Sequence, residues 1–226
     1  MACILVTGGT GYIGSHTVVE LQQQGYDVVV VDNLSNSSVD VLDGVEAITG
    51  KRPAFENVDC LDYANLDRVF EQYPDIDAVI HFAASKAVNE SVQKPLMYYR
   101  NNVVSLVNLL ELMSVHNVKN IVFSSSCTVY VQPDPEHLPV DETAPRKTAT
   151  SPYGNTKQIN EDILMDQAHA HEDLQVTILR YFNPIGAHPS ALIGELPNGV
   201  PGNLLPYVTQ TAIGLRERLR IFGDDY

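Results

Sequence analysis

A run of three serines and a tyrosine–lysine pair are the residues of this sequence best suited to chemistry. Ser126 closes an apolar stretch of strand length, and Tyr153 and Lys157 are four residues apart, on one face of an expected helix. A lysine ammonium beside a phenol stabilises the phenolate and lowers the tyrosine pKa from about 10 towards neutrality. Tyr153 is therefore predicted to act as a general base on a hydroxyl group, with Lys157 assisting, and Ser126 leaves the carboxyl end of its strand where ligands bind in such sheets.

A glycine-rich turn lies near the amino terminus, between an apolar run and an expected helix. Gly8 allows the tight turn, Gly11 lets backbone amides approach a pyrophosphate, and Gly14 lets helix and strand pack closely. Asp32 ends the next strand about eighteen residues further on, where a carboxylate accepts hydrogen bonds from ribose hydroxyls. The four residues after Asp32 include no Arg or Lys to pair with a 2′-phosphate, so NAD is favoured over NADP.

These groups need a scaffold, and the hydrophobic pattern predicts a doubly wound α/β fold of the Rossmann type with a parallel sheet. Short apolar runs alternate with helix-period segments, which indicates buried parallel strands joined by right-handed crossovers. The expected strands are Cys3–Thr7, Asp27–Val31, Ala54–Val58, Ala78–Phe82, Asn120–Ser124 and Gln175–Arg180. The expected helices are Tyr12–Gln24, Asn65–Tyr73, Pro95–His116 and Tyr153–Ala170.

The composition changes after the last of these strands. The segment Tyr181–Asn203 is rich in Gly, Pro and Asn, which predicts a long loop across the carboxyl edge of the sheet. A helix over Leu204–Leu215 and a short strand near Arg220–Phe222 are expected to follow. We therefore divide the chain into a dinucleotide-binding domain, residues 1–181, and the beginning of a substrate-binding region, residues 182–226.

Composition excludes several classes of protein. The chain has 226 residues, 44% of them hydrophobic, and a formal net charge of −14, which argues against a nucleic-acid-binding surface. Three widely separated cysteines indicate neither a zinc site nor a disulfide framework, and no metal is expected. The amino-terminal apolar run lacks the basic residues of a signal peptide, and no stretch is long enough to span a membrane. We expect a cytoplasmic protein.

Longer segments carry a resemblance to a known family. Gly8-x-x-Gly11-x-x-Gly14, Ser126 and Tyr153-x-x-x-Lys157 resemble the extended short-chain dehydrogenase/reductases. Within them, the chain is similar to the UDP-glucose (UDP-galactose) 4-epimerase family. The segments that carry this closer likeness are Val6–His16, Val79–Ala83, Glu90–Leu96, Val118–Ser126 and Leu179–Ser190.

The resemblance implies a redox-neutral epimerisation with NAD as a resident cofactor. Tyr153 would remove the proton of the sugar 4-hydroxyl while NAD takes the C4 hydride, and the 4-keto sugar would turn over before the hydride returns. Ser126 would hydrogen-bond the reacting oxygen, and Lys157 would tune Tyr153 and hold the nicotinamide ribose. The resemblance also implies a homodimer that pairs helices as a four-helix bundle, with a UDP-sugar as the small-molecule partner.

Further site residues follow from the resemblance, position by position. Besides Gly8, Gly11, Ser126, Tyr153 and Lys157, the cofactor site would include Tyr12, Ile13, Asp32, Asn33, Leu34, Ser35, Asn36, Ser37, Asp59, Cys60, Phe82, Ala83, Ala84, Lys86, Asn101 and Phe182. Besides Ser126 and Tyr153, the UDP-sugar would meet Lys86, Asn183, Asn203, Leu204, Arg220, Ile221 and Phe222.

Two alternatives stay open. Sister nucleotide-sugar dehydratases and decarboxylases place an acid just after the serine, where this chain has Cys127 and Thr128, so these reactions are disfavoured. The other alternative is a non-catalytic NAD-binding or regulatory protein on the same scaffold. Three departures from the family pattern, at Asn89, Val131 and Gly202, motivate it. A valine at a position of positive φ costs on the order of 1–3 kcal/mol or forces a new loop path.

The family pattern also continues past residue 226. Its members extend into a smaller domain that completes the uridine and sugar pocket and supplies an arginine for the diphosphate. The chain is therefore expected to be a fragment with impaired activity, and the wall that would decide on N-acetylated sugars is expected to lie beyond it.

Overall fold

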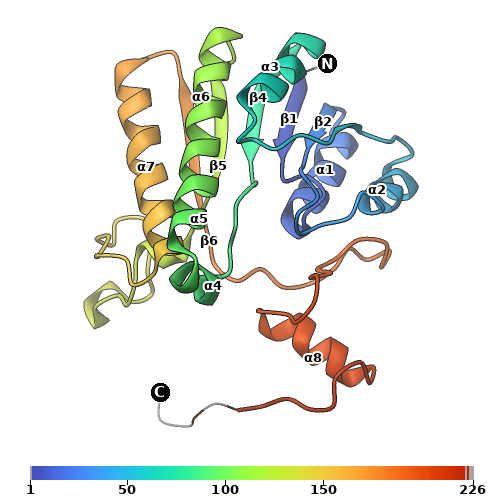
Figure 1. Ribbon diagram of the computed structural model, residues 1–226, viewed down its shortest axis with the longest axis vertical. Helices are drawn as coiled ribbons and strands as arrows, with labels where there is room; N and C mark the ends of the chain where they lie inside the picture. The colour runs from blue at the N-terminus through green and yellow to red at the C-terminus, as the bar shows by residue number, and fades with distance from the viewer. Residues whose placement is uncertain (1, 222, 224–226) are drawn as a thin grey trace.

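The centre of the fold is a six-stranded parallel sheet. The computed structural model describes residues 2–221 and 223, and its strands are ordered β3-β2-β1-β4-β5-β6 (Figure 1). Every neighbouring pair of strands is parallel. The strands are β1 Cys3–Thr7, β2 Asp27–Val31, β3 Ala54–Glu56, β4 Ile76–His81, β5 Asn120–Ser126 and β6 Gln175–Tyr181.

Helices cover both faces of the sheet, so the doubly wound Rossmann fold predicted from the sequence is confirmed. One apolar core joins β1, β4 and β5 to α3, α6 and α7 and contains Leu5, Phe70 and Leu109. The other lies under α1 and α2 and contains Val18 and Leu42. The helices are α1 Tyr12–Gln23, α2 Val41–Thr49, α3 Tyr63–Gln72, α4 Val88–Gln93, α5 Pro95–Tyr99, α6 Ser105–Val115, α7 Pro152–Ala170 and α8 Leu204–Ala212.

Several predicted boundaries were wrong. Helices α2 and α4 were not expected, and the single helix predicted from residue 95 to 116 is interrupted by a π-helical turn, Arg100–Val104. Helix α8 ends before the predicted Leu215 because Gly214 takes a φ of +81°, which terminates helices readily. Arg220 and Ile221 do not form the predicted strand, and Phe222 lies outside the described residues.

The strand order places a crevice at the carboxyl edge of the sheet. The chain winds outward from β1 to β3 on one side and from β4 to β6 on the other, so the order reverses between β1 and β4. Ligands of doubly wound sheets bind where the order reverses, beyond the carboxyl ends of the strands. The glycine turn after β1 and the residues after β4 and β5 all lie at this edge.

The segment after β6 crosses the same edge, as the sequence predicted. It runs beneath the sheet towards α1 and α2 before α8 begins (Figure 1). The phenol of Tyr12 donates to the carbonyl of Gly186 at 2.7 Å, and Ile193 is buried in the core beside α1 and α2. Among the described residues, no helix is both long enough and apolar enough to cross a membrane.

Candidate active site

The glycine turn after β1 is a backbone cradle that side chains would fill. Gly8 has a φ of +72°, and a Cβ there would lie 2.7 Å from the amide nitrogen of Ala83. A Cβ on Gly14 would lie 2.2 Å from the carbonyl oxygen of Gly8. Gly11 is the N-cap of α1, and no side chain caps the helix there. The amino end of α1 therefore presents free backbone amides and its positive dipole end, which suits a pyrophosphate.

Asp32 lies directly beside this cradle. Its carboxylate accepts from the amide of Thr10 at 3.3 Å, from the amide of Leu34 at 2.9 Å and from the hydroxyl of Ser37 at 3.0 Å. The side chain of Asn33 donates to Asp59 at 3.0 Å, which joins the loop after β2 to the loop after β3. The structure thus brings most of the predicted adenosine-side residues together at the ends of β1, β2 and β3.

The other predicted cofactor residues differ in burial. Cys60 is buried, and burial together with Asp59 and Asp32 raises the pKa of its thiol to about 12, so it stays protonated. Ser35 and Asn36 are exposed. Phe82 is partly buried against the core beside α1, and its neighbours Ala83 and Ala84 are also half-buried.

Ser126 and Tyr153 meet at the end of β5. Ser151 caps α7 by accepting from the amide of Gly154 at 3.1 Å, which fixes the first turn of the helix. Tyr153 lies in that turn, near enough to Ser126 for this side chain to lower the pKa of its phenol. The oxygen of Ser126 accepts from the amide of Thr128 at 3.2 Å.

Lys157 lies one turn further along α7 and is buried, with 3% of its surface exposed. Its ammonium donates to the carbonyl of Ser124 at 2.5 Å and lies over the Phe123 ring, 4.8 Å from the centroid. The same ammonium is 6.0 Å from the centroid of the Tyr153 ring. Burial lowers the pKa of Lys157 to about 8, against the opposing effect of Glu161.

The predicted lowering of the Tyr153 pKa is not what the structure shows. Burial raises the pKa of Tyr153 above its usual value, although the side chain of Ser126 acts in the opposite direction. The physical reason is desolvation, which disfavours a phenolate, while the Lys157 ammonium is engaged by the Ser124 carbonyl. The protein alone thus keeps Tyr153 as a phenol.

Asn102 is a site residue that sequence reasoning missed. It lies in the π-helical turn, buried, and its side chain accepts from the amide of Ser85 at 2.8 Å and donates to the Ser85 carbonyl at 2.9 Å. It also donates to the hydroxyl of Thr156 on α7 at 3.1 Å. The predicted Asn101 donates to the Ser85 hydroxyl at 3.2 Å. The π turn aims both amides at the loop after β4, and the helical period gave no signal of it.

His81 at the end of β4 was also missed. Its ring is hydrogen-bonded to the hydroxyl of Thr7 at 2.7 Å and is fully buried beside Phe123. Burial, reinforced by the charge of Lys157, lowers the pKa of His81 to about 3. The histidine is therefore neutral and joins the ends of β1 and β4 beneath the cradle.

Because His81 is neutral in the folded chain, the free energy of unfolding depends on pH. Because the folded pKa lies below the unfolded value of about 6.5, its contribution is complete above that pH and is lost as the pH falls towards 3. As the pH falls from 7 to 5, we expect the protonation of His81 in the unfolded chain to lower the free energy of unfolding by about 2 kcal/mol. His81→Gln should lose less stability over this interval, measured by urea unfolding. The exposed-histidine variant His169→Gln should behave as the unchanged chain does, and equal pH slopes for all three would contradict the assignment.

The predicted sugar-side residues after β6 are less closely gathered. Phe182, Asn183, Leu204, Arg220 and Ile221 are exposed. Lys86 and Asn203 converge instead on one carboxylate, that of Glu195: the Lys86 ammonium is 3.5 Å away, and the Asn203 amide donates to it at 2.5 Å. Glu195 was not predicted, and it ties the loop after β4 to the segment before α8.

The structure shows which backbone conformation or surroundings each of the three departures from the family pattern has. Val131 keeps a φ of +58°, so the left-handed backbone persists at a cost on the order of 1–3 kcal/mol. Asn89 lies within α4 and needs no unusual backbone. Gly202 lies in open space.

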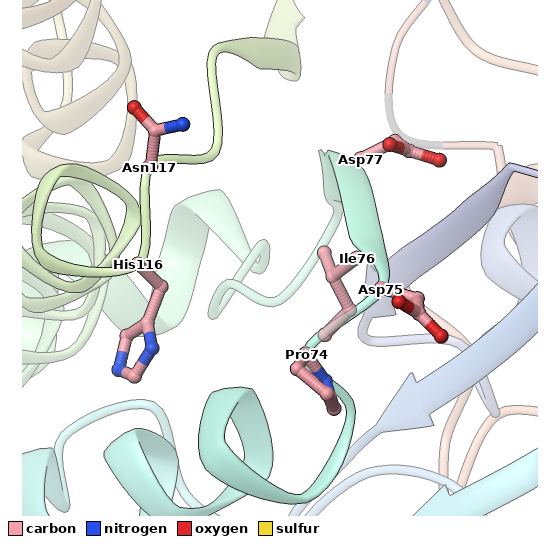
Figure 2. Close-up of a pocket in the computed structure, with 6 residues that line it drawn as sticks. All are labelled: Pro74, Asp75, Ile76, Asp77, His116 and Asn117. Atoms are coloured by element: carbon pink, nitrogen blue, oxygen red, sulfur yellow. The ribbon is translucent and has the colours of Figure 1, made fainter.

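A hollow of about 520 Å³ lies away from these residues, at the amino edge of the sheet (Figure 2). It is lined by Pro74, Asp75, Ile76, Asp77, His116 and Asn117, around the start of β4. None of the predicted site residues borders it. Within the described part of the chain, no three potential metal-ligating side chains are grouped together.

The fold and the site together define a doubly wound dinucleotide-binding protein with a serine–tyrosine–lysine cluster at its carboxyl edge. Residues 4–224 match the NAD dependent epimerase/dehydratase family, and the chain belongs to this family. The UDP-glucose 4-epimerase of Schizosaccharomyces pombe is 53% identical over 225 residues, which are 99% of this chain and 63% of that protein. The chain thus spans less than two thirds of the length of this relative.

Solved structures agree with the sequence match. The crystal structure of UDP-glucose 4-epimerase from Bifidobacterium longum in complex with NAD+ and UDP has a TM-score of 0.96 and 50% identity, over 99% of this chain and 66% of that one. The enzyme from Stenotrophomonas maltophila with bound NAD and formylated UDP-arabinopyranose has a TM-score of 0.94 and 49% identity, over 100% and 66%. The resemblance predicted from the motifs is confirmed.

Proposed function

We propose that the chain carries the NAD-binding and catalytic part of a UDP-glucose 4-epimerase, which interconverts UDP-glucose and UDP-galactose. The observation that carries this proposal is the placement of Ser126 at the end of β5 beside Tyr153 and buried Lys157 of α7, at the edge that also holds the glycine cradle. The named activities of the relatives support it.

The residues present fit NAD. Its pyrophosphate would lie on the amino end of α1, where a Cβ on Gly8 or Gly14 would fill the cradle. Asp32 would accept hydrogen bonds from the adenosine ribose, with Asn33 and Asp59 beside it. Thr10 and the loop after β2 present no cation to a 2′-phosphate, and this favours NAD over NADP.

The chemistry divides between three side chains. NAD, when bound, supplies the acceptor for the sugar C4 hydride and a positive ring that favours a phenolate nearby. Tyr153 takes the proton of the 4-hydroxyl as general base and returns it to the same oxygen after the ketone has presented its other face. Ser126 donates a hydrogen bond to that oxygen, and the Lys157 ammonium stabilises the phenolate. No net oxidation occurs, because the hydride and the proton both return.

Sister reactions on this scaffold remain less favoured. A dehydratase or decarboxylase needs a carboxylic acid after Ser126, and the short helix that follows begins with Cys127 and Thr128. Burial raises the pKa of the Cys127 thiol, so it does not replace a carboxylate at neutral pH.

A non-catalytic dinucleotide-binding protein is the second candidate, and two observations favour it. Val131, five residues after Ser126 in the sequence, holds strained backbone, and Glu195 already engages Lys86 and Asn203. In such a protein the cradle would hold NAD while the sugar side stays closed by these contacts.

One preparation tests both candidates. We expect the purified chain to contain NAD, measured after acid denaturation, and to convert UDP-galactose into UDP-glucose, measured by chromatography of the nucleotide sugars. Fluorescence of reduced nicotinamide after addition of the UDP-sugar would report the first hydride transfer by itself.

The outcomes separate the candidates clearly. Bound NAD with neither conversion nor reduction would favour the binding protein and overturn the epimerase proposal. Loss of carbon dioxide or water from a nucleotide sugar would favour a sister reaction. The homodimer, the cytoplasmic location and the division at residues 181 and 182 stay predictions, which sedimentation, fractionation and limited proteolysis would test.

A further inference from the structure

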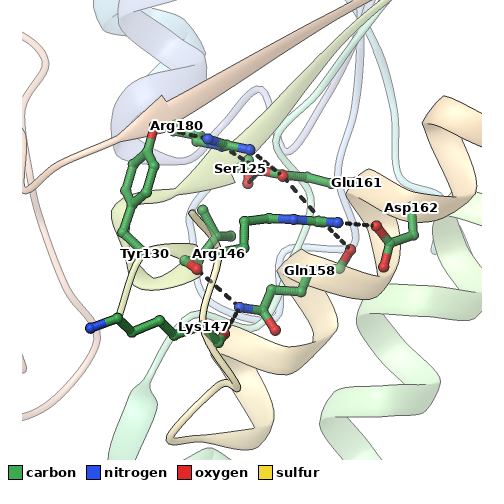
Figure 3. A network of polar contacts seen from close by, with 9 residues as sticks. Ser125, Tyr130, Arg146, Lys147, Gln158, Glu161, Asp162 and Arg180 are labelled. Atoms are coloured by element: carbon green, nitrogen blue, oxygen red, sulfur yellow. Dashed lines mark hydrogen bonds and ion pairs between the residues drawn. The ribbon is translucent and has the colours of Figure 1, made fainter. Parts of the chain in front are cut away.

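A buried carboxylate lies directly behind the catalytic cluster, and the proposed chemistry does not use it. Glu161 is one helical turn beyond Lys157 on α7 and has 2% of its surface exposed. Its carboxylate accepts from the hydroxyl of Ser125 at 2.5 Å and from both the Nε and Nη2 groups of Arg180, at 3.0 and 2.8 Å (Figure 3). Removing a carboxylate from water costs several kcal/mol, so a buried charge is stable only when it is paired and hydrogen-bonded as Glu161 is.

Further contacts fix the two arginines that lie beside Glu161. The Arg180 guanidinium donates to the hydroxyl of Tyr130 at 2.9 Å and lies over its ring, 4.8 Å from the centroid. Arg146 approaches Glu161 at 3.6 Å and pairs with Asp162 at 2.5 Å (Figure 3). The network joins α7 to β5, to β6 and to the loop before α7.

Three consecutive residues of β5 connect this network to the site. The carbonyl of Ser124 accepts from Lys157, and the hydroxyl of Ser125 donates to Glu161. Two successive residues at the end of β5 are therefore hydrogen-bonded to α7, and the next residue is Ser126, which lies beside Tyr153. Glu161 holds the residue directly before Ser126.

We propose that Glu161 is a positioning residue for the proposed epimerisation: it anchors the end of β5 through Ser125 and carries a buried negative charge one helical turn from Lys157 on the same helix. The proposal rests on the function proposed above. Glu161 touches neither sugar nor cofactor and acts through Ser125, Ser126 and Lys157.

The charge balance around Lys157 gives the direction of the effect. His81 on β4 is neutral at physiological pH, and the thiol of Cys127 and the phenol of Tyr153 both have raised pKa values. Glu161 raises the pKa of Lys157 while burial lowers it, to a balance at about 8. Arg180 from β6 is cationic and is compensated by the same carboxylate. Without Glu161, the ammonium of Lys157 would be lost at lower pH.

The decisive variant is Glu161→Gln, which keeps the shape and removes the charge. We expect the pKa of Lys157 to fall by about one unit, followed by NMR of lysine labelled with carbon-13 at Cε and assigned with Lys157→Met. The alkaline limb of the turnover profile should move down by the same amount. Asp162→Asn is the matched control, because it removes the next carboxylate of the same helix, whose side chain is 58% exposed.

Two further variants separate electrostatics from folding. Glu161→Asp keeps the charge and should leave the Lys157 titration near that of the unchanged chain. Glu161→Gln/Arg180→Gln removes both charges of the pair, so it should recover thermal stability lost in Glu161→Gln while the Lys157 titration stays displaced. If Glu161→Gln alone fails to fold, the Lys157 titration is measured in this double variant.

The NMR titration does not depend on turnover, so the two proposals fail separately. An unchanged Lys157 titration in both charge-removing variants would overturn the role of Glu161, whether or not the chain epimerises sugars. A displaced titration in a chain that never converts UDP-galactose would leave the charge pairing in place and overturn the proposed function.

Discussion

Tyr153→Phe is expected to reduce epimerase turnover by about 10²–10⁴-fold while leaving bound NAD unchanged. The substitution removes the hydroxyl whose oxygen would accept the sugar proton, and it keeps the aromatic ring. Because Tyr153 lies in the first turn of α7 and the glycine cradle precedes α1, the dinucleotide site should persist. Turnover of UDP-galactose and NAD content per chain, measured on the same preparation, check the two halves of this expectation.

Tyr99→Phe provides a matched control for this loss. Its hydroxyl accepts from the side chain of Asn155 at 2.7 Å, so the change removes a tyrosine hydrogen bond to the same helix without touching the reacting groups. We expect turnover within a few-fold of the unchanged chain. Equal activity of Tyr153→Phe and Tyr99→Phe would rule out Tyr153 as the base.

The pH dependence of Tyr153 follows from the same site. Its pKa is raised by burial in the protein alone, and this disfavours the phenolate that a general base requires. Two cations counter this effect in the proposed mechanism, the oxidised nicotinamide and the ammonium of Lys157. Under the proposed mechanism, Tyr153 would therefore act as a base only with the cofactor bound, and proton removal would be coupled to hydride transfer.

Gly14→Ala is expected to destabilise the fold and to abolish retention of NAD. The new Cβ would lie 2.2 Å from the Gly8 carbonyl oxygen and 2.8 Å from the Cα of Gly9, and both are backbone atoms that cannot rotate away. Helix α1 must therefore move off the turn, at a cost of about 1–3 kcal/mol, and its amino end leaves the pyrophosphate position. Thermal unfolding and NAD content measure the two effects.

Gly202→Ala is the control for the glycine substitution. No heavy atom lies within 4 Å of a Cβ at that position, and its φ is not positive, so neither stability nor NAD content should change. A Gly14→Ala chain with the melting temperature and NAD content of Gly202→Ala would show that close packing of α1 against the turn is not required.

Sequence by itself determined the fold class and indicated which residues could carry chemistry. Alternating apolar runs and helical periods require parallel strands with helices on both faces, because each strand must bury two sides. The spacing of Gly8, Gly11 and Gly14 specified the cradle, since only a residue without Cβ fits at 2.2 Å from a carbonyl oxygen. The four-residue spacing of Tyr153 and Lys157 placed them on one helix face.

Tertiary structure alone decided how these residues are charged and held. The lowered pKa expected for Tyr153 was wrong because burial raises the pKa of the phenol, and burial follows from packing and not from spacing. Glu161 and Arg180 are nineteen residues apart and pair only because β6 lies beside β5. Asn102 faces Ser85 because one π turn rotates the helix, which a regular period of apolar residues does not encode.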